Sequence, residues 1–134
     1  MARITTIEGI GPVNATKLAQ AGIKTTDALL KAGARPADRK QLAQVCDLSD
    51  KALLGWLNRA DLLRIKGIGE EYSDLLELAG VDTVPALAQR NPDNLHAKIV
   101  SVNSEKNVVR KLPSPKQVTA WVSQAKELPR AIHY

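Results

Sequence analysis

The sequence predicts an all-α protein made of two similar helical units, and three observations support this prediction. Of the 134 residues, 44% are hydrophobic but only 3% are aromatic and Phe is absent, so the core must consist of Leu, Ile, Val and Ala. No stretch alternates polar and apolar residues as a half-buried strand would. The chain also repeats itself, which is typical of a duplicated architecture.

The repeat appears when the sequence is compared with itself at an offset of 58 residues. The offset aligns Ile7, Gly9, Ile10, Gly11, Leu18, Ala21, Gly22, Thr25 and Leu29 with Ile65, Gly67, Ile68, Gly69, Leu76, Ala79, Gly80, Thr83 and Leu87. Further along, an offset of 65 aligns Ser49, Trp56 and Ala60 with Ser114, Trp121 and Ala125. The second copy therefore holds seven extra residues, which we assign to SVNSEKNVVRKLPSP. We expect one unit over residues 1–60 and another over 61–134, packed as one compact domain.

The helices of the first unit follow from its prolines and capping residues. Ile4–Glu8 can form only a short helix before the glycines. Pro12 fits the first position of the next helix, where its missing N–H costs nothing, and Gly22 ends that helix in a left-handed conformation. The remaining helices are expected to begin at Thr25 or Thr26 before DALLKAG, at Pro36 before ADRKQLAQVC, and at Ser49 before the helix of Trp56.

The second unit shows the same signals. Asn91-Pro92 opens DNLHAKIVSV, and Ser114-Pro115 opens the helix of Trp121. Between these two helices we expect a helix end and a loop that carries its cations on the surface. Trp56 and Trp121 could stack on bases, but their equivalent placement in both units favours burial in the two cores.

The stretch Gly9-Ile10-Gly11-Pro12 suggests a binding site for an anion. Two glycines let the backbone adopt positive φ and approach another group closely. The helix that follows presents N–H groups without helical partners and the positive end of its dipole. Such a turn can hold a phosphate and reads no base. Alternatively, the turn is only a tight corner between helices, with Ile10 filling the core.

These residues resemble a known motif. The pattern hydrophobic-x-Gly-hydrophobic-Gly-x-x-x-Ala-x-x-Leu resembles the helix-hairpin-helix motif, and GIGPVNATKLAQAGIKT most closely resembles the hairpins of X-family DNA polymerases. The motif covers residues 6–25 and again 64–83, and it implies a SAM-like helix-hairpin-helix architecture. The whole chain is similar to an uncharacterised bacterial and archaeal family of domains, a resemblance that implies no established activity.

The helix-hairpin-helix resemblance implies which groups of the first unit would hold DNA. Backbone amides around Ile10 would bind consecutive phosphates, and a basic side chain on the second helix would assist. In this sequence the amides are those of Gly9, Gly11, Val13 and Asn14, and the basic residue is Lys17. Hairpins of this kind can also bind a monovalent cation, K⁺ or Na⁺, through carbonyls that match Thr5, Ile7 and Ile10.

The second hairpin departs from this pattern. Gly67 and Gly69 are present and Lys66 precedes them, but Glu70 and Glu71 stand where phosphate oxygens would approach. Negative charges at a helix N-terminus stabilise the helix and repel an anion. We therefore expect Gly11→Val to reduce DNA affinity and Gly69→Val to leave it unchanged, although both should cost similar stability.

The net charge of +5 is unevenly distributed: residues 1–60 carry +4, residues 61–103 carry −3 and residues 104–134 carry +4. A basic balance favours approach to a polyanion. The expected loop adds Lys106, Arg110 and Lys111 to the candidate DNA-binding residues.

Evidence for other chemistry is sparse. His96 and His133 are far apart and Cys46 is the only cysteine, so no metal-ligand spacing or catalytic arrangement is present. We expect no enzymatic activity, no membrane association, and a reducing, cytoplasmic location. Two hypotheses remain: a module that binds DNA without sequence preference, or a module that binds an unidentified protein and uses the hairpins as structural corners.

Overall fold

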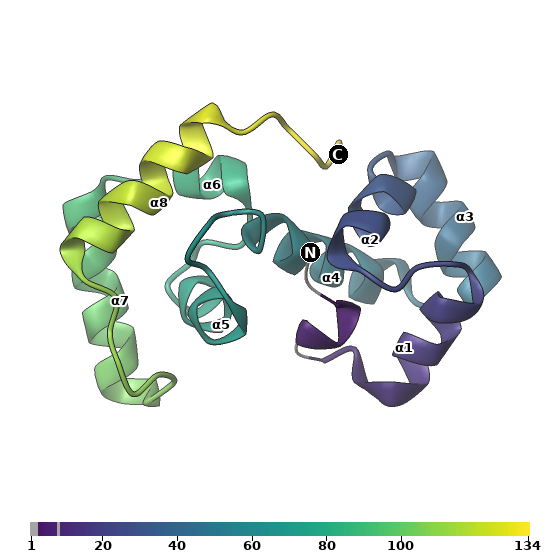
Figure 1. The fold of residues 1–134 in the computed structure, drawn as a ribbon, viewed down its shortest axis with the longest axis horizontal. Helices are drawn as coiled ribbons and strands as arrows, with labels where there is room; N and C mark the ends of the chain where they lie inside the picture. Colours follow the sequence, from purple (N-terminus) through teal and green to yellow (C-terminus); the bar gives the residue numbers. More distant parts are fainter. Residues whose placement is uncertain (1–2, 8) are drawn as a thin grey trace. The chain divides into compact units, whose positions relative to one another are not determined.

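The computed structural model describes residues 3–7 and 9–134, and in this part of the chain the regular elements are all helical (Figure 1). The only extended pairing among these residues is an isolated antiparallel bridge between Arg3 and Thr25. The prediction of an all-α protein is therefore confirmed. The elements are η1 (Ile4–Thr6), α1 (Gly11–Gln20), α2 (Thr26–Gly33), α3 (Pro36–Cys46), α4 (Asp50–Leu62), α5 (Glu70–Leu78), α6 (Val84–Ala88), α7 (Pro92–Lys106) and α8 (Pro115–Glu127).

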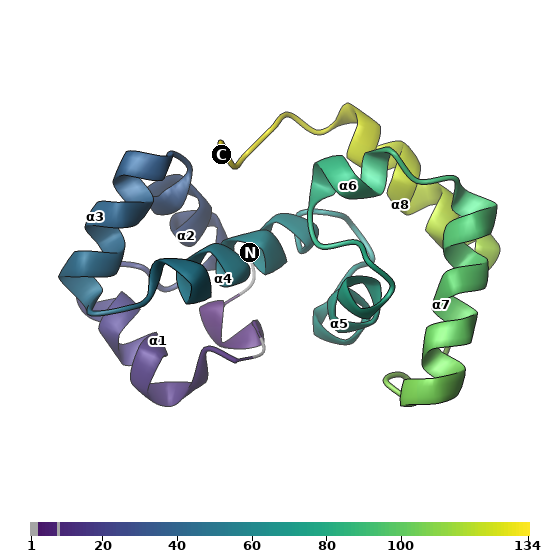
Figure 2. The same ribbon diagram turned by 180° about the vertical axis from the view of Figure 1, so that it is seen from behind.

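The chain divides into two compact units. The first comprises the chain up to Asp61 together with Arg130–Tyr134, and the second comprises Leu62–Pro129. In the first unit α2 packs against α3, and η1 packs against α1. In the second unit α8 packs against both α6 and α7, and α5 packs against α7, as Figures 1 and 2 show from opposite sides.

The final residues of the chain are part of the first unit through specific contacts. The side chain of Ile132 is buried. The backbone N–H of His133 donates to the carbonyl of Ala34 at 2.7 Å, directly after α2. The Tyr134 hydroxyl donates to Asn58 Oδ1 in α4, also at 2.7 Å. Residues 130–134 thereby complete a core whose other members precede residue 62.

Most of the helix starts agree with the caps expected from the sequence. The side chains of Thr25 and Thr83 accept hydrogen bonds from the amides of Ala28 and Ala86, at 3.1 and 3.2 Å, and so begin α2 and α6 in the same way. The remaining side-chain caps are Ser49 for α4, Asn91 for α7 and Ser114 for α8, the last of which forms a complete capping box with Gln117.

Two boundaries near the N-terminus differ from the expected ones. Helix α1 begins at Gly11, so Pro12 occupies its second position rather than its first. Proline is tolerated at both positions because neither amide has a partner within the helix. The short first helix was expected over Ile4–Glu8, but it ends at Thr6. Glu8 lies outside the described residues.

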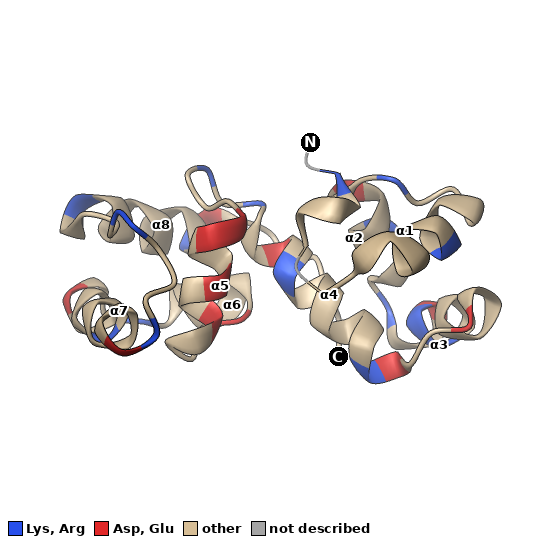
Figure 3. Cartoon of the chain, turned by 90° about the horizontal axis from the view of Figure 1, so that it is seen from below, with Lys and Arg blue, Asp and Glu red and all other residues tan. Residues whose placement is uncertain are grey.

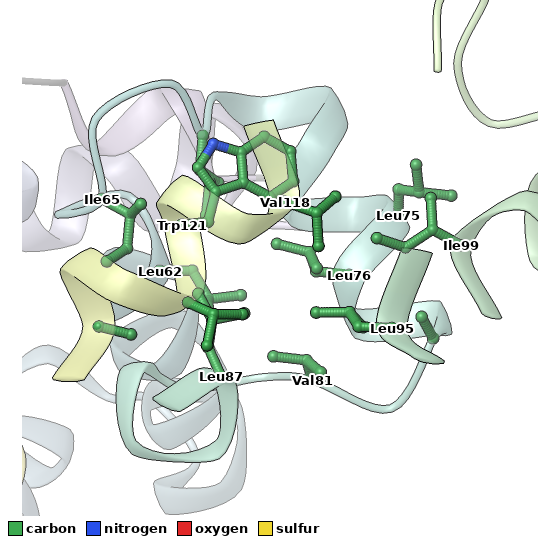
Figure 4. Close-up of a cluster of buried hydrophobic side chains, with 14 of the residues drawn as sticks. Leu62, Ile65, Leu75, Leu76, Val81, Leu87, Leu95, Ile99, Val118 and Trp121 are labelled. Carbon is green, nitrogen blue, oxygen red and sulfur yellow. The ribbon is translucent and has the colours of Figure 1, made fainter. Parts of the chain in front are cut away.

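Both tryptophans are buried, as expected: Trp56 is 8% exposed and Trp121 is 2% exposed. Figure 4 shows Trp121 at one side of the aliphatic core of the second unit, next to Val118, with its nitrogen turned away from Leu76. The rest of that core is formed by residues of all four helices and the turns between them, including Leu62, Ile65, Ile68, Leu75, Val81, Leu87, Leu95 and Ile99.

Each indole lies beneath the first glycine of a Gly-Ile-Gly turn. Gly9 and Gly67 adopt φ of +91° and +96°, values that L-residues with a Cβ rarely adopt. A Cβ placed on Gly67 would lie 3.0 Å from Trp121 Nε1, and one on Gly9 would lie 4.0 Å from Trp56 Nε1. The first glycines of the two turns thus share a positive φ, but the second turn is packed more tightly on its tryptophan.

The second glycines of the two turns are not equivalent. Gly11 has φ of +68°, whereas Gly69 has φ of −107° and is the extended N-cap of α5. Any L-residue can adopt the conformation of Gly69, so only a substitution at Gly11 places a Cβ in the left-handed region. The expectation that Gly11→Val and Gly69→Val cost similar stability is therefore wrong.

The difference in packing around the first glycines leads to a stability prediction. Gly9→Ala and Gly67→Ala both force an L-residue to positive φ, at a cost of about 1–2 kcal/mol. Gly67→Ala also presses a methyl group against buried Trp121, and such overpacking typically adds about 1–3 kcal/mol. Denaturant unfolding of the two variants should show the larger loss for Gly67→Ala; equal losses would contradict this account of the tryptophan contact.

Candidate nucleic-acid interface

The first Gly-Ile-Gly turn exposes its backbone to solvent while its central side chain is buried. Ile10 lies in the core, whereas Gly9 and Gly11 are exposed. Val13, in the first turn of α1, is 69% exposed, and Asn14 is half-buried. The first turn of α1 contains no acidic residue. Among the described residues, the amides at the start of this helix, apart from that of Pro12, can therefore face an anion without a carboxylate in the same helical turn.

Lys17 does not lie at this turn. It belongs to the last turn of α1, about 9 Å along the helix axis from Gly11 at 1.5 Å per residue. Its Nζ donates to the carbonyl of Asp47 at 3.1 Å, and Asp47 ends α3 in a left-handed conformation. Lys17 thus satisfies a carbonyl at the C-terminus of α3, where a cation also complements the helix dipole.

The second turn has a different charge environment. Glu70 and Glu71 are exposed in the first turn of α5. In Figure 3 this end of α5 is coloured red, whereas α1 shows no red. The backbone N–H of Lys66 donates to Gln124 Oε1 at 3.0 Å, and Gln124 Nε2 donates back to the carbonyl of Lys66 at 3.3 Å. These bonds fix the backbone of Lys66 and leave its side chain exposed.

The loop over residues 107–114 carries its cations on the surface, as expected. Lys106 ends α7, and the side chains of Lys106, Arg110 and Lys111 are exposed. The helix that precedes this loop is long: α7 has 15 residues, against 11 in α3 of the first unit.

Three side chains anchor this loop. Asn103 is the main anchor, because its Oδ1 accepts from the amides of Val108 and Val109, both at 2.9 Å, while its Nδ2 donates to the carbonyl of Val109. Tyr72 donates its hydroxyl proton to the carbonyl of Lys111 at 3.0 Å. His96 Nε2 lies 3.0 Å from the carbonyl of Pro113.

The anchor at Tyr72 places the loop next to the second Gly-Ile-Gly turn. Tyr72 follows Glu70 and Glu71 in α5, and its ring packs on Trp121 with centroids 5.4 Å apart. The backbone of Lys111 therefore lies beside the start of α5. Sequence reasoning did not foresee this proximity, because no local pattern links Tyr72 to a residue 39 positions away.

The carbonyls assigned to a monovalent cation lie in similar turns in the two units. The carbonyl of Ile7 accepts from the amide of Ile10 at 3.4 Å, and that of Ile65 accepts from Ile68 at 3.2 Å. A carbonyl oxygen has two lone pairs, so neither bond excludes a second interaction. Across residues 3–7 and 9–134, no cluster of three or more His, Cys, Asp or Glu residues could hold a metal ion.

Cys46 is a buried core residue at the end of α3. Burial raises the pKa of its thiol, and the nearby positive charge of Lys17 opposes this shift only in part. Its Sγ lies 3.8 Å from the carbonyl of Lys17 as a weak donor. A buried thiol with a raised pKa is mostly protonated near neutral pH, which makes it a poor nucleophile.

With this geometry in hand, the chain can be compared with known proteins. Residues 8–128 match the model of a family described as a domain of unknown function (DUF4332), and the chain belongs to this family. This agrees with the expected resemblance to an uncharacterised family. No solved structure matches the chain. None of the helices in the described part of the chain is long and apolar enough to cross a membrane.

The anchoring of the loop can be tested through Asn103. Asn103→Ala removes the acceptor of two amides, and Val109 is buried, so unsatisfied groups should cost about 1–3 kcal/mol locally. Amide hydrogen exchange at Val108 and Val109 should accelerate. Tyr72→Phe deletes a single bond to an exposed carbonyl and should have a smaller effect on the same amides. Unchanged exchange in Asn103→Ala would show that other contacts hold the loop.

Proposed function

We propose that this protein is a non-catalytic module that binds DNA without sequence preference, through backbone phosphates held at the first Gly-Ile-Gly turn. The observation that carries the proposal is the open backbone at Gly11. Gly11 is exposed at φ of +68°, a Cβ built there would meet nothing within 4 Å, and α1 begins without an acidic residue. Among the described residues, no atom near the Cβ position of Gly11 and no acidic residue in the first turn of α1 opposes a phosphate oxygen that approaches the amides there.

We further infer that both units are helix-hairpin-helix units derived from an internal duplication. Pairs of residues 58 positions apart support this inference: Gly9 and Gly67 both have positive φ, Thr25 and Thr83 both cap helices, and Gly22 and Gly80 both have positive φ. The tryptophan of each unit lies near the first glycine of its turn. Both copies would thus share a framework. Only in the first copy would the helix after the glycine turn, α1, have an N-terminus that favours an anion.

The exposed cations of the second unit would extend the contact with DNA. Lys106, Arg110 and Lys111 are exposed, and the last two lie on a loop that is anchored by side-chain hydrogen bonds. An anchored loop loses less conformational entropy when its cations bind phosphates. Lys66 would add a fourth cation near the second turn, where it would partly offset Glu70 and Glu71.

A monovalent cation, K⁺ or Na⁺, would fit the same proposal. If the carbonyls of Thr5, Ile7 and Ile10 converge on such a cation, it would neutralise part of the phosphate charge at the first turn. The carbonyl of Ile7 keeps a lone pair beside its bond to Ile10, which is compatible with this role.

The alternative function, a protein-interaction module, is favoured by a different observation. Val45 is 71% exposed and lines a hollow of about 250 Å³ on α3 and the end of α2, with Ala32, Leu42, Asp38 and Gln41. In this alternative the glycine turns would act as corners, which agrees with the burial of Ile10 and Ile68. We favour DNA because the exposed backbone at Gly11 is not needed for a corner.

Gly11→Val should reduce the affinity for a mixed-sequence DNA duplex more than its loss of stability explains. Its Cβ enters the space through which a phosphate would approach. Gly69→Val should leave affinity unchanged, because Glu70 and Glu71 already disfavour an anion at the second turn, and it should also cost less stability because φ at Gly69 is not positive. Fluorescence anisotropy at low salt and thermal unfolding of the same samples measure both effects.

Gly22→Val is the matched control for backbone strain. Gly22 follows the opposite end of α1, is exposed, has φ of +84°, and has open space around its Cβ position. It should therefore lose about as much stability as Gly11→Val, roughly 1–2 kcal/mol, and keep its DNA affinity. If Gly11→Val and Gly22→Val bind alike, or if the wild-type protein ignores DNA at low ionic strength, the proposed function is wrong.

Replacing Lys106, Arg110 and Lys111 together with Ala should weaken DNA binding and reduce its salt dependence. Each lost phosphate contact lowers the slope of log K against log salt by about 0.9 for duplex DNA, so three contacts would lower it by up to about 2.7. Anisotropy titrations over a KCl series give this slope. An unchanged slope would exclude the loop from the interface.

A further inference from the structure

A second hollow lies on the first unit. It measures about 260 Å³ and is lined by η1, α1 and the turn after α1, with Arg3, Ile4, Thr5, Ala15, Thr16, Ala19 and Lys24 as its walls. None of these lining residues is acidic. Two cationic side chains thus border one hollow, and their mutual repulsion would be relieved by a bound anion.

Backbone pairing brings the two cations together. The amide of Ile4 donates to the carbonyl of Lys24 at 3.2 Å, next to the bridge between Arg3 and Thr25. Segments that are distant in sequence are therefore held side by side by backbone atoms. Ala15 and Ala19, one turn apart on α1, give the hollow a floor without long side chains.

The hollow adjoins the first turn of α1. The Thr16 hydroxyl donates to the carbonyl of Pro12 at 2.9 Å, so the wall of the hollow reaches the residue that follows Gly11. Because this hydroxyl proton is committed to Pro12, the donors for an anion in the hollow are Arg3, Lys24 and the hydroxyl of Thr5. An anion there would lie on the same helix as the amides at Gly11.

The residues that align with four members of the hollow are acidic. At the offset of 58, Arg3 corresponds to Asp61 and Lys24 to Asp82, while Thr16 and Ala19 correspond to Asp74 and Glu77. Two cations and two neutral residues thus align with four acidic residues, of which Asp61 is buried and belongs to the first unit. The sign of the charge is reversed at two of these positions, those of Arg3 and Lys24, so the cations of the hollow are not a shared feature of the sequence repeat.

We propose that this hollow is a second phosphate subsite, which takes a backbone phosphate next to the one held at the Gly-Ile-Gly turn. The proposal rests on the proposed DNA-binding function. Arg3 offers a planar fork of donors that matches phosphate geometry, and Lys24 adds a point charge. The volume of about 260 Å³ is sufficient for a phosphate group.

The test compares two double variants of equal charge. Arg3→Ala with Lys24→Ala removes both cations of the hollow, while Lys40→Ala with Lys51→Ala removes two exposed cations of the same unit that lie on α3 and α4. Anisotropy with a labelled mixed-sequence duplex is recorded over a KCl series. Thermal unfolding checks that all variants remain folded, which we expect because the hollow is held together by backbone bonds.

The hollow variant should bind DNA more weakly than the control variant and lose up to about 1.8 in the slope of log K against log salt, for two phosphate contacts. Arg3→Lys with Lys24→Arg should restore most of the binding, because it keeps both charges. If the hollow and control variants lose affinity and slope equally, the subsite is excluded while the proposed function stands.

Inorganic phosphate distinguishes a DNA subsite from a site for the free anion. A phosphate titration followed by ¹H–¹⁵N NMR should shift the amides of Thr5, Thr16 and Lys24, and these shifts should vanish in Arg3→Ala with Lys24→Ala. If the wild-type protein does not bind DNA, the proposed function fails. In that case, shifts at these amides would still support the hollow as a site for free phosphate, and their absence would overturn it.

Discussion

The contact between a buried tryptophan and the first glycine of a Gly-Ile-Gly turn determines how each unit is arranged. Trp56 and Trp121 fill the space beneath Gly9 and Gly67, and the central isoleucine of each turn points into the same core. With Ile10 and Ile68 buried, the glycines on either side of each isoleucine are exposed. The first turn thus combines a buried side chain with the exposed backbone that we assign to phosphate binding.

The two units differ mainly in what surrounds this shared corner. In the second unit Tyr72 packs on Trp121 and bonds to the backbone of Lys111, so the turn, its tryptophan and the loop form one continuous set of contacts. The corresponding residue of the first unit is Asn14, which has no ring to pack on Trp56. The first corner is consequently more open, and the second is more firmly braced and more acidic.

Local chemistry was sufficient to predict the helices. Capping side chains such as Thr25, Ser49 and Ser114 satisfy amides three residues away, so their effect can be read from sequence alone. Burial of the tryptophans followed from their equal placement in the two copies. The caps could be predicted from residues close together in the chain, and the burial of the tryptophans from the alignment of the chain with itself.

The site was harder to predict, because it depends on distant parts of the chain. Gly11 and Gly69 occupy the same place in the repeat but adopt different φ, which no local pattern signalled. Lys17 seemed placed for a phosphate, but its ammonium group bonds to Asp47, 30 residues away. The hollow bordered by Arg3 and Lys24 depends on the bridge between Arg3 and Thr25, which are separated by 21 residues of sequence.

The segment Arg130–Tyr134 affects the order in which the protein can be completed during synthesis. The second unit, Leu62–Pro129, is translated between the two parts of the first. Ile132 and the bonds from His133 to Ala34 and from Tyr134 to Asn58 become available only when the end of this sequence has left the ribosome. The unit that begins first is thus finished last, and the unit encoded in the middle can be complete before it.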